Sequence, residues 1–386
     1  MEKDVKILVV DDTVTDRQIL SKIIAGMDNA ELAGIAPNGR IALSKIAIKQ
    51  PDLVLLDVFM PEMDGLETLA RIKAAYPHID VVMISGIDQE TAQITVKALE
   101  SGALDFVPKP RGPSPDQNME TLRVVLSRLI SMARTRKYSR QVQGLAPATV
   151  SARGVTPLTT PVIQSRPPVV LPSPSTMPVR PAPARQVART PGRIDVVALG
   201  VSTGGPNALQ ELIPLLTEDF GVPILAVQHM PTMFTASLAA RLDSVSAIRV
   251  VEAQEGDLIR SGTLYIAPGG RHMVVRRDRR NRKVVGLVDS PPVNSCRPSV
   301  DVLLRSVAMV YGGHVLTVIL TGMGNDGLAG VAAIRRKGGY SLVQDEKTSV
   351  IWGMPGAVVE AEQADEIVPL PKLAERISRL VQKGRA

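Results

Sequence analysis

The sequence predicts two α/β domains, each built on a mostly parallel sheet, joined by a proline-rich linker. Strand-like apolar runs alternate with helix-like apolar spacing over residues 5–135, and the same alternation resumes at residue 193. Such alternation is typical of parallel sheets covered by helices. Residues 136–192 lose this periodicity and are rich in proline, as expected of a partly extended spacer. We therefore expect domains over 1–135 and 193–386, with a basic linker over 136–192.

Composition and charge restrict the class of protein. The 386 residues are 45% hydrophobic, which is enough for two cores. Aromatic residues make up only 3%, which argues against a base-stacking surface, and we expect no nucleic-acid partner. The net charge of +7 is misleading, because every charged residue between Glu120 and Asp195 is Arg or Lys. The positive charge therefore belongs to the linker rather than to a nucleic-acid-binding domain.

Three further features concern the compartment. Cys296 is the single cysteine, which excludes an intramolecular disulfide and fits a reducing environment. No apolar run approaches the roughly 20 residues that a membrane span requires. The charged N-terminus does not resemble a signal peptide. We expect a cytoplasmic, monomeric protein that is not inserted in a membrane.

The first domain is predicted to contain five strand–helix pairs. The expected strands are residues 5–10, 31–35, 53–56, 81–84 and 105–107, and the helices lie near residues 19–24, 41–48, 66–72, 91–99 and 122–130. A sheet of this kind is parallel, with helices on both faces.

Polar side chains follow these strands. Asp11 and Asp12 end the first, Asp57 the third and Ser85 the fourth, and Lys109 follows the fifth. The carboxyl ends of parallel strands share one edge, so these groups should meet. Gathered carboxylates repel unless a cation such as Mg²⁺ binds them. The set fits phosphorylation of Asp57, although strand-end carboxylates that are merely solvated are the plain alternative.

These residues, together with the motifs around them, resemble the response-regulator receiver family. The matching positions are Asp11-Asp12, Asp57, Met60-Pro61, Asp64-Gly65, Ser85-Gly86 and Lys109-Pro110. The resemblance implies a (βα)₅ flavodoxin-like fold and phosphotransfer from a cognate histidine kinase to Asp57.

The same resemblance implies the ligands and sensors of the site. Mg²⁺ would be held by Asp11, Asp12, Asp57 and the backbone of Phe59, and Ser85 and Lys109 would sense the phosphoryl group. Phe106 takes the aromatic switch position, and the Lys109–Pro110 bond is expected to be cis.

The second domain is also predicted to be a doubly wound, mostly parallel α/β sheet. The expected strands are residues 194–199, 222–227, 315–320 and 340–344, the helices lie near 207–213, 300–307, 328–334 and 373–381, and a hairpin flap is expected over 256–276.

Ser202 lies in the glycine-rich turn 200–206, between the first of these strands and a helix. Such a hydroxyl is either a nucleophile or part of an anion-binding loop at a helix N-terminus. No phosphate-loop lysine follows, which favours the nucleophile. His229 and Asp326 also follow strands that should be central, so they can meet Ser202 as base and orienting carboxylate. Backbone N–H groups of this turn or near Met323 are candidates for the oxyanion hole.

Several alternatives compete with this triad. The Gly-x-Ser-x-Gly spacing also matches the nucleophile elbow of α/β-hydrolases, but the chain order Ser, His, Asp differs from that fold. His229 alone would often be structural. The competing side chains are His272 and His314 for the base, Asp301 and Asp345 for the carboxylate, and Cys296 for the nucleophile.

The second half resembles the chemotaxis protein-glutamate methylesterases of the CheB family. The matching stretches are 200–206, 228–231, 267–269 with 272–273, 298–301, 321–327 and 352–356. The resemblance implies hydrolysis of glutamate methyl esters on chemoreceptor helices, with deamidation of glutamine. It makes Ser202 the nucleophile, His229 the base and Asp326 the orienting group.

The resemblance also places Thr203, His272 and Met323 in the lining of the site, and it implies no cofactor for the esterase. The expected partners are methylated chemoreceptors and a histidine kinase, whose phosphorylation of Asp57 activates the enzyme. Two other classes stay open: a receiver-controlled serine hydrolase with another substrate, and a non-catalytic phospho-switch.

Overall fold

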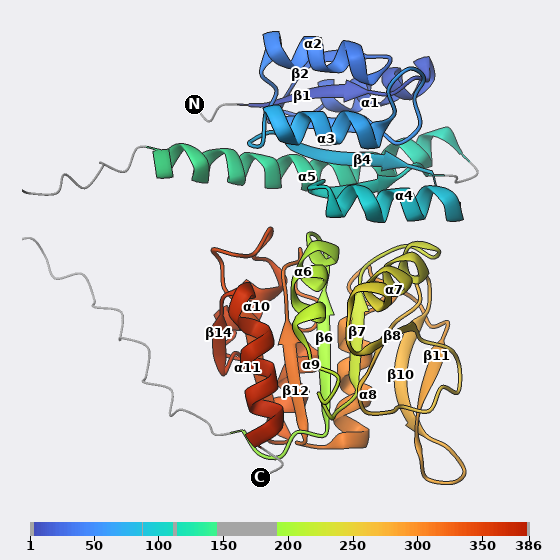
Figure 1. The fold of residues 1–386 in the computed structure, drawn as a ribbon, viewed down its shortest axis with the longest axis vertical. Coiled ribbons are helices and arrows are strands. Elements are labelled where there is room, and N and C mark those ends of the chain that lie inside the picture. Colours follow the sequence, from blue (N-terminus) through green and yellow to red (C-terminus); the bar gives the residue numbers. More distant parts are fainter. Residues whose placement is uncertain (1–3, 87, 111–113, 145–190, 384–386) are drawn as a thin grey trace, which may run out of the picture.

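The computed structural model describes residues 4–86, 88–110, 114–144 and 191–383, which form two α/β domains (Figure 1). Each domain contains one parallel sheet with helices on both faces. Of the predicted linker over 136–192, residues 145–190 lie outside the described residues. The fold class expected from the alternating pattern is therefore confirmed for both domains.

The first domain has five strands in the order β2-β1-β3-β4-β5, all paired in parallel. Its elements are β1 (Val5–Val10), α1 (Val14–Ala25), β2 (Ala30–Ala36), α2 (Gly39–Lys49), β3 (Leu53–Asp57), α3 (Gly65–Ala75), β4 (Asp80–Ser85), α4 (Gln89–Glu100), β5 (Asp105–Pro108) and α5 (Pro115–Gly144). Helices α1 and α5 cover one face of the sheet, and α2, α3 and α4 cover the other.

Short polar side chains start three of these helices. The side chains of Asn38, Asp64 and Asp88 accept hydrogen bonds from the third backbone N–H beyond them, at 3.0, 2.8 and 2.9 Å. Each satisfies a donor that the first helical turn leaves unpaired. The helices α2, α3 and α4 therefore begin where the strand-to-helix turns end.

Helix α5 continues to Gly144, past residue 135, where the linker was expected to begin. Two basic residues of this extension pair with the first domain. Lys137 lies 2.7 Å from Asp52, and Arg136 lies 3.3 Å from Asp80. These charges appeared to belong to the linker because sequence alone does not show that α5 passes the acidic residues of the sheet.

The second domain has seven strands in the order β14-β13-β12-β6-β7-β9-β8, again all parallel. Its strands are β6 (Val196–Val201), β7 (Ile224–Gln228), β8 (Arg249–Glu252), β9 (Thr263–Ile266), β10 (His272–Arg277), β11 (Lys283–Val288), β12 (Val315–Ile319), β13 (Tyr340–Gln344) and β14 (Glu366–Val368). Its helices are α6 (Gly205–Leu212), the 3₁₀ turn η1 (Ile213–Leu215), α7 (Phe234–Val245), α8 (Val300–Tyr311), α9 (Leu328–Arg336), α10 (Met354–Glu360) and α11 (Leu370–Lys383).

Several elements of this domain differ from the expectation. The predicted flap is two structures, since β9 joins the main sheet beside β7 while β10 and β11 form a separate antiparallel hairpin. Strands β8 and β14 and helices α7 and α10 were not predicted. Both strands are short edge strands, whose sequence pattern is too brief to detect.

The strand order places a crevice at β6 and β12. The chain leaves β6 towards β7 on one side and reaches β12 and β13 on the other, so the order reverses between β6 and β12. Open parallel sheets bind ligands outside the carboxyl ends of strands at such a reversal. Ser202 follows β6 directly, and the loop after β12 leads to Asp326.

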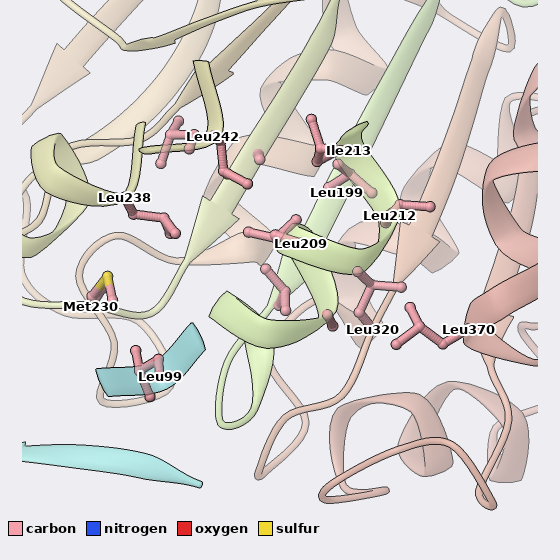
Figure 2. Close-up of a cluster of buried hydrophobic side chains, with 14 of the residues drawn as sticks. Leu99, Leu199, Leu209, Leu212, Ile213, Met230, Leu238, Leu242, Leu320 and Leu370 are labelled. Atoms are coloured by element: carbon pink, nitrogen blue, oxygen red, sulfur yellow. The ribbon is translucent and has the colours of Figure 1, made fainter. Parts of the chain in front are cut away.

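The two domains pack against each other through α4 of the first and α6 and α7 of the second. Figure 2 shows Leu99 of α4 with Met230 and Leu238 in one buried apolar cluster. Arg241 pairs with Glu100 across the boundary. This packing brings the end of β5 to the carboxyl edge of the second sheet.

Candidate active site and candidate phosphorylation site

The turn that presents Ser202 is held by backbone hydrogen bonds. The N–H of Ser202 donates to Thr321 O at 3.0 Å, and the N–H of Gly205 donates to Ser202 O at 2.8 Å. Gly204 has a φ of 73°, a conformation that favours glycine. A Cβ on Gly322 would lie 2.7 Å from the Ser202 Cβ, so only glycine permits this approach of the two loops.

His229 and Asp326 come together as predicted. His229 Nε2 lies 2.8 Å from Asp326 Oδ2. Asp326 also accepts hydrogen bonds from Ser299 Oγ (2.8 Å), the Val300 N–H (2.7 Å) and Asn294 Nδ2 (2.9 Å). Burial favours a higher pKa for Asp326, but these donors, with His229 first, hold the pKa at about 2. Asp326 is therefore a fixed negative charge.

The other ring nitrogen of His229 is directed elsewhere. Nδ1 lies 3.6 Å from Cys296 Sγ, and the described hydrogen bonds include none between His229 and Ser202. Burial would lower the pKa of His229, but Asp326 and Cys296 raise it to about 9. Ser202, His229 and Cys296 line one cavity of about 420 Å³. The structure therefore places Ser202 and His229 in the lining of one cavity and Asp326, which is buried, behind His229, and no hydrogen bond between Ser202 and His229 is found among the described residues.

Gln228, at the end of β7, connects the two loops that carry Ser202 and His229. Its side-chain Nε2 donates to Ser202 O at 3.0 Å and to His229 O at 3.1 Å. Sequence reasoning gave Gln228 no role, although an amide ending a wholly buried strand is an available signal. The roles of Ser299 and Asn294 were also missed, although Ser299 lies in the stretch 298–301 that carried part of the family resemblance.

Of the three residues predicted to line the site, two do so. Thr203 and Met323 line the cavity, and no hydrogen bond from their backbone N–H groups is found among the described residues. His272 is completely buried behind the site, which corrects the prediction. Its Nδ1 accepts from the Ser299 N–H, and its Nε2 lies 3.1 Å from Pro291 O. His272 therefore holds Ser299, which in turn contacts Asp326.

The competing residues have other places in the fold. His314 Nδ1 lies 3.2 Å from Arg193 O, away from the cavity. Asp345 accepts from the Thr348 N–H at 3.1 Å, and Asp301 accepts from the Gly330 N–H at 2.7 Å. Asp301 nevertheless lies beside Asp326, because its N–H donates to Asp326 at 3.2 Å and its side chain accepts from Asn294 at 3.1 Å; no hydrogen bond between Asp301 and His229 is found among the described residues.

The carboxylates of the first domain also converge. Oxygen atoms of Asp11, Asp12 and Asp57 lie within 4.8 Å of one another. Lys109 Nζ lies 2.9 Å from Asp11 and 3.1 Å from Asp57. An all-oxygen set of this kind fits a hard cation such as Mg²⁺. Burial raises the pKa of Asp57 to about 6. The positive charge of Lys109 lowers this pKa, and the negative charge of Asp11 raises it.

Ser85 lies next to this cluster, because the Lys109 N–H donates to Ser85 O at 2.7 Å. Its hydroxyl is buried, and it has no hydrogen-bond partner among the described residues. An unpaired buried hydroxyl is costly, so a group that accepts its hydrogen bond would be stabilised there. The expected cis bond at Lys109–Pro110 is absent; the cis bond in the described chain is Arg297–Pro298.

Strand β5 reaches the cavity of the second domain through Asp105, Phe106 and Pro108. These residues line the cavity together with Ser202 and Thr203. The ring of Phe106 stacks on that of Phe234, with centroids 4.5 Å apart and planes at 18°. The first domain therefore covers part of the cavity.

Two parallel α/β domains, one with a convergent carboxylate cluster and one with a cavity that Ser202 and His229 line, define a response regulator with an enzymatic output domain. Residues 7–118 match the response regulator receiver domain, and residues 197–377 match the CheB methylesterase. The chain belongs to the CheB methylesterase family and is an ester hydrolase with a receiver domain. A receiver implies a phosphodonor kinase, and the methylesterase domain implies a protein substrate.

Two relatives are similar over the whole chain. The protein-glutamate methylesterase/protein-glutamine glutaminase of Trichodesmium erythraeum is 44% identical, over 97% of this chain and 99% of its own. That of Pyrococcus horikoshii is 39% identical, over 99% and 95%. The solved catalytic domain of Thermotoga maritima CheB is 41% identical, over 49% of this chain and 99% of that domain, with a TM-score of 0.48. Among the described residues, no helix has both the length and the apolar character of a membrane span.

Proposed function

We propose that this enzyme hydrolyses glutamate methyl esters on the signalling helices of chemoreceptors, and deamidates glutamine there, to give sensory adaptation. The observation that supports this most directly is the cavity itself, where His229 lies between a buried, charged Asp326 and the side of the cavity that Ser202 lines. The names of the relatives indicate the substrate. A cytoplasmic site fits the single free thiol of Cys296.

The hydrogen bonds define the direction of proton transfer. Because Nε2 of His229 is bonded to Asp326, Nδ1 is the nitrogen that accepts the proton of Ser202. Ser202 then attacks the ester carbonyl, and the N–H groups of Thr203 and Met323, for which no acceptor is found among the described residues, would stabilise the oxyanion. His229 returns the proton to the leaving methanol, and a water molecule releases the acyl group by the same steps in reverse.

Phosphorylation of Asp57 by a histidine kinase would control access to this cavity. Asp11, Asp12 and Asp57, with the Phe59 carbonyl, would hold Mg²⁺, which when bound neutralises charge on the carboxylates and the phosphoryl oxygens. The unpaired hydroxyl of Ser85 supports a phosphoryl-binding role for that residue.

The contacts of β5 support a route from the phosphoryl site to the esterase. Phe106 lies in β5, which pairs with β4, the strand that ends in Ser85. The ring of Phe106 packs on Phe234 of the esterase domain. Movement of Ser85 and Lys109 towards the phosphoryl group would draw Phe106 inwards and release Asp105 from Thr203. The equilibrium then shifts towards an open cavity.

The test is methanol release from methyl-labelled receptors by the full chain, with and without a phosphodonor. Ser202→Ala should lower the rate at least about a thousandfold, since loss of a triad nucleophile removes most of the catalysis. Ser378→Ala, on α11 and outside the cavity lining, is the matched control. Full activity of Ser202→Ala would refute the triad, and hydrolysis of simple esters but not of receptors would favour the other serine-hydrolase class.

A further inference from the structure

The cavity of the esterase domain contains a second set of groups that the triad does not explain. His229, Cys296 and Asp326 offer a nitrogen, a sulfur and an oxygen that lie within 4.8 Å of one another. The triad uses His229 and Asp326, but it has no need of a thiol. The position of Cys296 beside the catalytic base therefore requires a separate account.

The distance between His229 Nδ1 and Cys296 Sγ is 3.6 Å. A tetrahedral Zn²⁺, with bonds of about 2.05 Å to nitrogen and about 2.3 Å to sulfur, would hold these two atoms about 3.6 Å apart. A cation of this size therefore fits between them at their present separation.

The orientation of His229 is also that of a metal ligand. Histidines that bind metals usually donate the other ring N–H to a carboxylate, which fixes the tautomer and the plane of the ring. Here Nε2 lies 2.8 Å from Asp326, whose oxygens are held by Ser299, Val300 and Asn294. The Nδ1 lone pair is thereby directed at Cys296.

The remaining coordination positions face the cavity of about 420 Å³, which leaves room for water. Asp326 is less suited to bind the cation directly, because its two oxygens already accept four hydrogen bonds in addition to the one from His229. Thiolate and imidazole ligands favour Zn²⁺ and similar cations over Mg²⁺. The site thus differs in chemistry from the carboxylate cluster of the receiver.

We propose that His229 and Cys296 bind a soft divalent cation such as Zn²⁺, and that the bound cation inhibits the esterase. The cation would occupy the Nδ1 lone pair that accepts the proton of Ser202. The inhibition rests on the proposed function, whereas the binding does not. The two parts are therefore tested by different measurements.

Binding is measured on the full chain by titration with Co²⁺ or Cd²⁺ in excess Mg²⁺, which occupies the receiver carboxylates. A thiolate-to-metal charge-transfer band should appear in the wild type and in Asp57→Asn, and it should be absent in Cys296→Ser and Cys296→Ala. The two Cys296 variants keep the receiver cluster, so they control for cations bound there. Absence of the band in the wild type would overturn the proposal.

Inhibition is measured as the ratio of rates with and without Zn²⁺, so each variant is its own reference. Saturating Zn²⁺ should lower the wild-type rate about a hundredfold, because a general base contributes at least about that much. A chelator should restore the rate, and Cys296→Ser should lose most of the inhibition. Equal inhibition of Cys296→Ser, or a thiolate band without inhibition, would refute the inhibitory role. An inactive enzyme that still shows the band would refute the proposed function and leave the binding site established.

Discussion

Asp57 and Asp326 are carboxylates of the same kind in similar positions, yet their charges are controlled in opposite ways. Both follow parallel strands, and their exposed fractions are only 6% and 2%. Burial raises the pKa of Asp57 to about 6, whereas the pKa of Asp326 is held at about 2. Asp326 receives several neutral donors together with His229, while Asp57 shares Lys109 with Asp11. Because the two carboxylates are similarly buried, the difference between their pKa values comes from their hydrogen-bond donors.

The same comparison separates a fixed site from an incomplete one. The donors around Asp326 come from rigid turns, so this carboxylate can orient His229 without changing. The cluster around Asp57 contains an unpaired hydroxyl on Ser85 and a lysine divided among three carboxylates. A phosphoryl group would complete it. The following predictions test this difference, from the largest expected effect to the smallest.

The largest effect is expected from Asp326→Asn. An amide cannot hold the His229 tautomer that leaves Nδ1 as the acceptor, and the corresponding change in a known triad costs about 10⁴-fold in kcat. The measurement is kcat for methanol release from methylated receptors. Asp345→Asn is the control, since Asp345 follows the neighbouring strand β13 and its side chain accepts hydrogen bonds from Thr348. A loss of less than about tenfold would contradict the fixed-charge role.

The pH dependence of the phosphorylated enzyme is the next largest effect. His229 must be neutral to accept a proton, and its pKa is raised to about 9. A base with that pKa is only about 1% neutral at pH 7, so the rate should rise about a hundredfold on going to its plateau above pH 9. Asp326 stays charged throughout, because its pKa is about 2. An inflection at the ordinary histidine pKa would show that Asp326 and Cys296 do not stabilise the imidazolium.

Asp57→Asn should act on regulation rather than on chemistry. The ratio of rates with and without phosphodonor should fall to one, from a coupling that is typically about 5- to 150-fold. Asp326→Asn should lower both rates but keep the ratio of rates with and without phosphodonor. This difference distinguishes the roles of the two carboxylates. Stimulation that persists in Asp57→Asn would place the phosphoryl group on another residue.

The smallest effect concerns the contact between the domains. Burial raises the pKa of Asp105 to about 7. A raised carboxyl pKa means that burial of Asp105 favours its neutral form, so the domain packing that buries it is fully favoured below about pH 4 and weakens as the pH rises through about 7. Asp105→Asn stays neutral and should keep the contact.

The unphosphorylated rate of Asp105→Asn, divided by that of the wild type, should therefore fall about two- to tenfold between pH 6 and pH 8, because ionisation of one buried carboxyl with a pKa of about 7 changes the equilibrium by up to about tenfold over this range. The ratio cancels the titration of His229. Phe106→Ala, which removes the stacking on Phe234, should raise the rate at both pH values. A ratio that does not change with pH would show that Asp105 does not hold the closed state.

The sequence by itself determined the two α/β domains and the residues that their strands present. Apolar periodicity is a local property, so it locates β1 to β5 and β6, β7, β12 and β13 within a few residues. Polar residues after such strands stand out, which is why Asp57, Ser202, His229 and Asp326 were predicted to be at the sites. The short edge strands and the full length of α5 were not predictable, since their boundaries depend on packing.

Only the tertiary structure decided which of these residues act together and in what state. Asn294 and Ser299 approach Asp326 from one segment that is far from it in the sequence, and Gln228, next to His229, contacts the Ser202 loop, so no spacing in the sequence records these contacts. The burial of His272 and the approach of Cys296 to His229 likewise depend on where the 290–299 segment lies. A strand pattern specifies which residues lie at the end of a strand. The charge and the hydrogen-bond partners of their side chains depend on distances of a few ångströms between segments far apart in the chain.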